Sequence, residues 1–157
     1  MATIKSQYGL SNQSISVTIA GLANNGQRSS AAVDNTSSLY LDCLIQVLVK
    51  SGASGTSATG YVNVYVYGTA DGGSHYADGV AGSDAGVTLS VNPPVFVTSI
   101  NVTANATTYL SRLISLAAVF GGVVPDHWGI VIENKSGATL DGSVGSAWYQ
   151  GLWNQAA

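Results

Sequence analysis

The residues best suited to acid–base or metal chemistry are two histidines, His75 and His127, and eight acidic residues, of which Glu133 is the only glutamate. The two histidines are too far apart in the sequence for an H-E-x-x-H zinc helix. A site of two histidines and a carboxylate would need both rings to converge from distant loops. We therefore expect no metal centre built on histidine.

The aspartates favour turns over catalysis. Asp71, Asp78 and Asp141 each precede a glycine, as in many turns. A glycosidase needs two carboxyl groups about 5 to 10 Å apart across a cleft, and no spacing here indicates such a pair. Asp71, Asp78 and Asp84 share a segment that could offer oxygens to Ca²⁺. Their spacing does not match a D-x-D-x-D-G calcium loop, so we expect a solvated loop.

Two further features of the sequence involve reactive side chains but favour a structural role. Asp126 and His127 are adjacent, and neighbours on an extended chain point to opposite faces, so we expect a turn that enters a strand there. Cys43 lies in an apolar run and is expected to be a buried small hydrophobe. The sequence contains neither G-x-S-x-G nor G-x-G. We expect no catalytic activity and no cofactor.

Charge is unusually sparse in this chain. Its 157 residues include 8% charged residues, with five Lys and Arg and a net charge of -3, against about 25% charged residues in an average domain. Five basic residues cannot neutralise a run of phosphates, which argues against nucleic acid and anionic membranes as partners. The N-terminal residues show no signal-peptide pattern, and no apolar run approaches the ~18 residues of a membrane span. We expect a soluble protein made without export.

Aromatic residues give the one positive signal. Tyr61, Tyr65 and Tyr67 alternate with valines and would share the outer face of one strand. Such a stripe has three interpretations: an extension of the core beneath a loop, a subunit or partner interface, or a platform on which sugar rings stack. The low charge content favours the interface over the sugar platform, because a freely exposed surface usually carries more charge.

Strands must position these side chains. Residues 39–50 are apolar at every odd position, which predicts a long strand with one buried face. The glycine- and serine-rich residues 51–60 predict a hairpin loop into a strand at 61–67 whose valines face the core. The glycine-rich segment 68–86 predicts a long irregular loop. Further strands are expected at 15–19, 87–91, 95–103, 108–116, 128–133 and 139–153. The segment 108–116 also fits a helical stripe, but we favour a strand that ends in a short turn.

This pattern predicts an all-β fold, an antiparallel jelly-roll-like sandwich of about eight strands. Residues 1–30 are expected to form an N-terminal arm or the first strand region. Residues 31–157 are expected to form the sandwich domain. Composition does not shift along the chain, so a single globular domain is expected.

Three blocks of sequence, YLDCLIQVLV, AAVFGGVVPDHWGIVIEN and SAWYQGLW, together resemble small structural proteins of tailed bacteriophages, in particular head decoration or cement proteins. The resemblance implies a protein made in the host cytoplasm that decorates the capsid exterior, often as a homotrimer. It implies that the major capsid protein is the partner, although a tail-associated protein would have a similar composition. Interface residues are expected in the arm, the tyrosine strand and the loop: Ile4, Tyr8, Tyr61, Tyr65, Tyr67, His75 and Tyr76.

A carbohydrate-binding or receptor-binding sandwich module is the alternative. The tyrosine stripe would stack against sugar rings, and the Asp- and Gly-rich loop at 68–86 would lie beside it.

Overall fold

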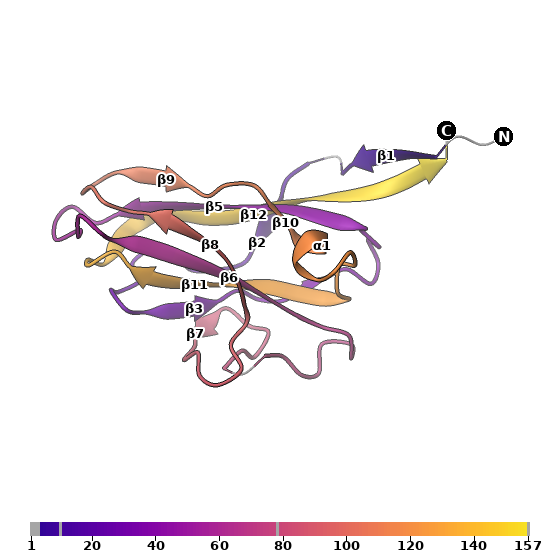
Figure 1. Cartoon of the computed structure of the whole chain (residues 1–157), viewed down its shortest axis with the longest axis horizontal. Coiled ribbons are helices and arrows are strands. Elements are labelled where there is room, and N and C mark those ends of the chain that lie inside the picture. The colour runs from indigo at the N-terminus through magenta and orange to yellow at the C-terminus, as the bar shows by residue number, and fades with distance from the viewer. Residues whose placement is uncertain (1–3, 10, 78, 157) are drawn as a thin grey trace.

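The structure is a computed structural model that describes residues 4–9, 11–77 and 79–156. It is a sandwich of two antiparallel sheets, which we name sheet A and sheet B (Figure 1). Sheet A contains β1 (Ile4–Tyr8), β2 (Gln13–Ile15), β5 (Asp42–Ser51), β9 (Thr108–Leu110), β10 (Ile114–Ser115) and β12 (Leu140–Ala156). Sheet B contains β3 (Gln27–Ser29), β4 (Val33–Asp34), β6 (Tyr61–Thr69), β7 (Ala85–Gly86), β8 (Val95–Asn101) and β11 (His127–Lys135). The predicted all-β antiparallel sandwich is confirmed.

Of the eleven connections between successive described strands, six cross from one sheet to the other and five stay within a sheet. In sheet A, β12 lies between β5 and the pair β1 and β2, and β5 continues the sheet to β9 and β10. In sheet B the order is β7, β3, β11, β6 and β8. Among the described strands, β6 and β8 are the one pair of successive long strands that are hydrogen-bonded neighbours in a sheet.

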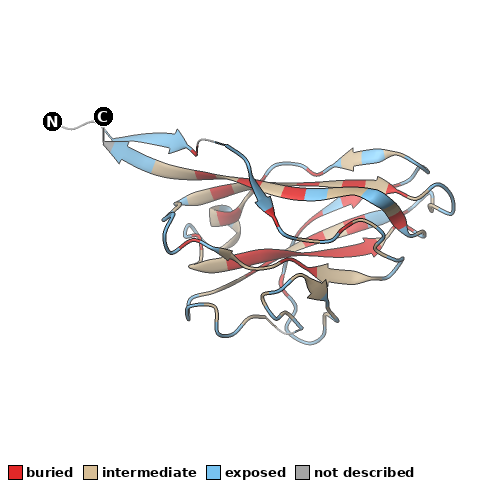
Figure 2. Cartoon of the chain, turned by 180° about the vertical axis from the view of Figure 1, so that it is seen from behind, coloured by how far each residue is buried: buried red, intermediate tan, exposed pale blue. Residues whose placement is uncertain are grey.

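The core lies where the two sheets face each other (Figure 2). From sheet A, β5 contributes the odd-numbered residues Cys43 to Val49, and all four are buried. From sheet B, β6 contributes Val62, Val64 and Val66, which are also buried. Both predictions of a period-two buried face are therefore confirmed. Trp128 packs between the sheets, and its ring meets that of Tyr149 edge-on with 5.1 Å between centroids.

The predicted hairpin at residues 51–60 is wrong. β5 and β6 belong to different sheets, so this segment arches from sheet A to sheet B. A flexible Gly/Ser loop serves a hairpin or an arch equally well. Period-two alternation identifies the buried face of a strand but not the sheet that the strand joins.

Several predicted strand bounds also change. The strand predicted from residue 39 begins at Asp42, because Leu39 has a positive φ of 50° and lies exposed in a turn. The N-terminal strand covers Gln13–Ile15 and does not reach residue 19. Residues 87–91 form no strand, and the short β7 precedes them. Residues 108–116 form β9 and β10, and the chain then enters the one-turn helix α1 (Leu116–Val119).

Residues at the two ends of the sequence form a ribbon that projects from the sandwich (Figures 1 and 2). β1 pairs antiparallel with the end of β12, with Ile4 opposite Ala156 and Tyr8 opposite Leu152. All five residues of β1 are exposed. We call β1 and residues 152–156 of β12 the terminal ribbon. Among the described residues, no helix has the length and apolar character of a membrane span.

Candidate interaction surfaces

The outer face of sheet B presents the predicted aromatic residues Tyr61 and Tyr65. The register places Tyr65 opposite Phe96 of β8, and their rings meet edge to face with 5.6 Å between centroids. Tyr61 and Phe96 are exposed, and Tyr65 is partly buried. Alternation along β6 keeps these rings away from the core, as the sequence predicts.

Glu133 anchors this face. Its carboxylate accepts hydrogen bonds from the side chains of Asn63 at 2.9 Å, Gln27 at 2.8 Å and Tyr65 at 2.9 Å. Burial would raise the pKa of this carboxyl, but the three hydrogen bonds and the Lys135 ammonium outweigh it and lower the pKa. Glu133 therefore stays ionised and ties polar side chains of β3 and β6 to β11.

Tyr67 does not belong to an exposed tyrosine stripe. It is 1% exposed, so the prediction that it is an exposed tyrosine is wrong. Its hydroxyl donates to the carbonyl oxygen of Ser30 at 2.8 Å, and its ring meets Tyr76 edge-on at 5.3 Å between centroids. Burial raises its pKa to about 12. Of the three interpretations of the stripe, core beneath a loop is the one that describes Tyr67.

The loop between β6 and β7 carries the other two predicted residues. Tyr76 is partly buried against Tyr67 and lies close over Gly82, where a Cβ atom would collide with its ring. His75 is exposed, and its Nδ1 atom lies 2.7 Å from the Asp71 carboxylate. Asp71 also accepts hydrogen bonds from the Thr69 hydroxyl and from the backbone amides of Ser74 and His75, which lowers its pKa. Asp71 thus stabilises a turn, as the sequence predicts.

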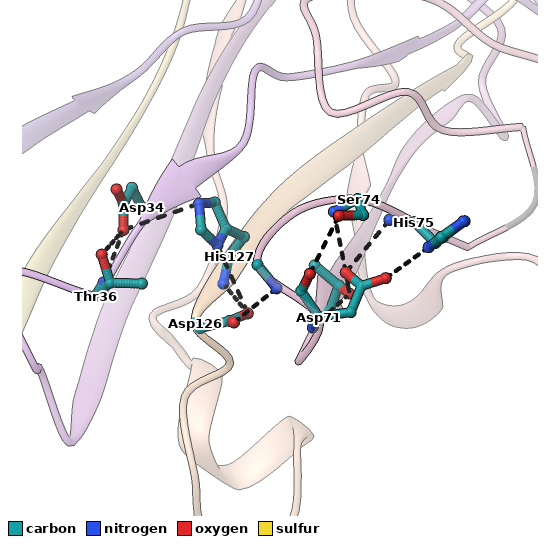
Figure 3. Close-up of polar contacts among 9 residues, drawn as sticks. Asp34, Thr36, Asp71, Ser74, His75, Asp126 and His127 are labelled. Atoms are coloured by element: carbon teal, nitrogen blue, oxygen red, sulfur yellow. Dashed lines mark hydrogen bonds and ion pairs between the residues drawn. The ribbon is translucent and has the colours of Figure 1, made fainter.

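His127 lies between two carboxylates (Figure 3). Its Nδ1 atom is 3.6 Å from Asp126 and its Nε2 atom is 3.9 Å from Asp34. The predicted turn that enters a strand is confirmed, because Asp126 lies in a bend and β11 begins at His127. The two side chains nevertheless lie close together, since Asp126 precedes the extended chain. The Asp126 carboxylate accepts hydrogen bonds from the backbone amides of His127 and Gly72, so it ties the loop to the start of β11.

These side chains do not make a metal site. Among the described residues, no group of three or more His, Cys, Asp and Glu side chains is placed to hold a metal ion. Asp78 of the considered calcium loop lies outside the described residues. Asp84 is held by Arg28 at 2.6 Å and by the Thr18 hydroxyl at 2.6 Å. Cys43 is fully buried, and burial raises its pKa to about 12, so its thiol is not poised for nucleophilic attack.

The terminal ribbon holds the last two predicted residues, Ile4 and Tyr8. They are 70% and 58% exposed and lie on one face of the ribbon. Tyr40 joins the ribbon to the sandwich, since its ring stacks on Trp153 at 5.5 Å between centroids. The predicted residues are thus divided among the ribbon, the loop and the outer face of sheet B.

Sequence reasoning missed a further surface, the outer face of sheet A. Leu44 and Leu48 of β5 point away from the core, and so does Trp148 of β12. The signal was present in the sequence, because β5 carries leucines at even positions as well as apolar residues at every odd one. A strand that is apolar on both faces indicates a second contact surface.

No protein-family model matches this chain. No curated protein and no solved structure matches it either.

Proposed function

We propose that this chain is a non-enzymatic structural protein of a phage virion. It decorates and stabilises the capsid exterior by binding the major capsid protein, and it does so as a homo-oligomer, a trimer in the group that it resembles. The three sequence blocks that resemble head decoration proteins motivate this proposal. The terminal ribbon is the structural observation that supports it best, because a two-stranded ribbon is at best marginally stable in water without a surface to pack on.

The mechanism is passive attachment through a rigid scaffold. Among the described strands, β1 is the last on its side of sheet A, so its outer edge is open for pairing with a strand of a partner. Tyr61 and Phe96 offer exposed rings on the other sheet. Several weak contacts of this kind, multiplied by the number of subunits in the oligomer, hold tightly through avidity.

Composition of the virion tests this proposal. Mass spectrometry of purified particles, with heads and tails separated, should find the chain in the head fraction in many copies. Electron microscopy should show its density on the outer capsid surface and not inside. Absence of the chain from purified particles would overturn the proposal, and its presence in the tail fraction alone would overturn the capsid location.

Sugar or receptor binding is a second candidate. The observation that favours it is the pairing of exposed rings, Tyr61 and Phe96, with the fixed carboxylate and amides around Glu133. Rings that stack on sugars and polar groups that bind hydroxyls are the usual components of such a face. A glycan array read with millimolar sugar and calcium tests it. Binding that is lost in Tyr61→Ala would support this candidate, and no binding would remove it.

A further inference from the structure

Sheet A has an apolar outer face that the fold leaves open. Register fixes its members, because residues paired across strands share a face: Leu44 and Leu48 of β5 lie on the side opposite the core, with Trp148 and Leu152 of β12. Leu110 of β9 pairs with Leu48 and is 50% exposed. The side chains of Leu44, Leu48, Trp148 and Leu152 are partly exposed. We call this set, with Leu113, the sheet-A face.

The terminal ribbon extends the sheet-A face. Tyr8 pairs with Leu152, so the exposed side chains of Ile4 and Tyr8 continue the same surface beyond the sandwich. At the junction, a shallow groove of about 300 Å³ is lined by Tyr8, Leu44, Leu113 and Trp148, with the amides of Asn12, Gln46 and Gln150. The apolar surface is therefore continuous from the sandwich to the ribbon.

Sheet B shows what a covered outer face looks like in the same chain. Val131 points to its outer side, opposite Tyr65, and is nevertheless fully buried. The long connection between β6 and β8 lies over this side, where Leu89 donates its backbone amide to the Gln27 side chain (Figure 1). Sheet A exposes leucines and a tryptophan at the corresponding positions. A sheet with apolar residues on both faces normally has both faces covered.

We propose that the sheet-A face, with the terminal ribbon, is the contact surface between copies of this chain. The inference deepens the homo-oligomer of the proposed function and rests on it. The lack of charge on this face favours a second copy of the chain as the partner that covers it. Near a symmetry axis each side chain meets its own copy, so a charge there would face an identical charge.

The sheet-A face meets this requirement. Charged residues on this side of β5 lie only at its two ends, and each has a partner within the chain: Lys50 pairs with Asp141 of β12 at 3.0 Å, and Asp42 accepts from the Ser115 hydroxyl at 2.7 Å. Between these ends, the described strand residues on this face are uncharged. Gln46 and Gln150 carry amides that donate and accept, so they can bind their own copies.

The size of the face also fits. β5 has 10 residues and β12 has 17, and the other four strands of sheet A have 2 to 5 residues each. At about 3.3 Å per residue and about 4.8 Å between strands, the whole of sheet A covers about 600 Å², the ribbon included. Specific, stable interfaces begin at about 600 Å² buried on each partner. The face with its ribbon therefore provides the area that a lasting contact between copies needs.

Oligomer mass tests this inference. Light scattering coupled to size-exclusion chromatography, at about 50 µM protein, should give the wild-type chain a mass of at least two subunits. Leu48→Glu and Trp148→Glu place a repelling charge in the middle of the face and should give monomers. Phe96→Glu is the matched control, because Phe96 is exposed on the outer face of sheet B, and it should keep the wild-type mass. Circular dichroism should show the same β spectrum for all four proteins.

Each result counts for or against the inference. A monomeric wild type, or an oligomer that persists in both sheet-A variants, would overturn it. If only Phe96→Glu dissociates, the contact lies on sheet B and the inference fails. Co-sedimentation with purified phage heads separates this inference from the proposed function. If the wild type is monomeric and binds heads, and Leu48→Glu abolishes this binding, the capsid protein occupies this face and the inference fails. If the chain forms the sheet-A oligomer but does not bind heads, the inference stands and the proposed function fails.

Discussion

At the residue scale, burial and hydrogen bonding give each ionisable or aromatic group its role. Tyr65 and Tyr67 are two positions apart on β6 and point to the same side of sheet B. Tyr65 remains partly open and donates to Glu133, whereas Tyr67 is buried and donates to Ser30. The sequence pattern identified their shared face correctly. It could not identify which ring the loop covers, because that depends on where Tyr76 packs.

Tyr67→Phe tests the buried hydroxyl. The variant keeps the ring but leaves the Ser30 carbonyl without its 2.8 Å donor. We expect a loss of about 1 to 2 kcal/mol in the free energy of unfolding, the usual cost of an unsatisfied buried acceptor. Urea denaturation measures it. Tyr61→Phe is the control, since Tyr61 is exposed, and it should match the wild type. Equal stability of all three proteins would contradict this role of the hydroxyl.

At the scale of elements, local periodicity predicted strands better than it predicted their connections. The valines of β6 and the odd residues of β5 face the core as predicted, because burial of one face imposes a period of two. The connection from β5 to β6 was assigned to the wrong class. The terminal ribbon was also unforeseen as a pair, since β1 is fully exposed and has no apolar period of its own. β1 forms a strand because it pairs with β12, and this partner is distant in the sequence: Ser6 and Asn154, which pair, are 148 residues apart.

Gly151→Ala tests the junction between ribbon and sandwich. The Tyr40 ring lies directly over Gly151, so an added Cβ would collide with it. We expect about 1 to 3 kcal/mol of destabilisation from this overpacking, with a loss of the stacking between Tyr40 and Trp153. Thermal unfolding and near-UV circular dichroism measure the two effects. Gly142→Ala in the same strand is the control, because a Cβ there meets nothing within 4 Å. A Gly151→Ala protein as stable as this control would show that the junction is not tightly packed.

At the scale of the whole molecule, the few charges are committed to holding turns and strands together. The pKa values of five carboxyl groups are lowered, those of Asp34, Asp71, Asp84, Glu133 and Asp141. Hydrogen bonds from neighbouring side chains or amides act on all five. The sequence revealed how few charges there are and that aspartates occupy turns. It could not reveal the Glu133 cluster, whose members come from β3, β6 and β11.

Acid should therefore destabilise the fold. A carboxyl whose pKa is lower in the folded than in the unfolded chain stabilises the fold above its unfolded pKa, and this stabilisation is lost as pH falls through the folded pKa. We expect the melting temperature to be level from about pH 8 to 5 and to drop below about pH 4, near the ordinary Asp and Glu values. Differential scanning calorimetry across this range measures it. Glu133→Gln should show a shallower acid slope, and a melting temperature that rises below pH 4 would contradict the role of these carboxylates.

The position of β12 in sheet A has a consequence for how the chain is made. β12 is the last strand in sequence, yet it lies between β5 and the strands β1 and β2, and it pairs with all three. Until residues 140–156 leave the ribosome, β5 lacks its longest partner and the two N-terminal strands have none in sheet A. The sandwich therefore closes only after synthesis of β12, and an apolar, nearly uncharged nascent chain must remain unaggregated until then.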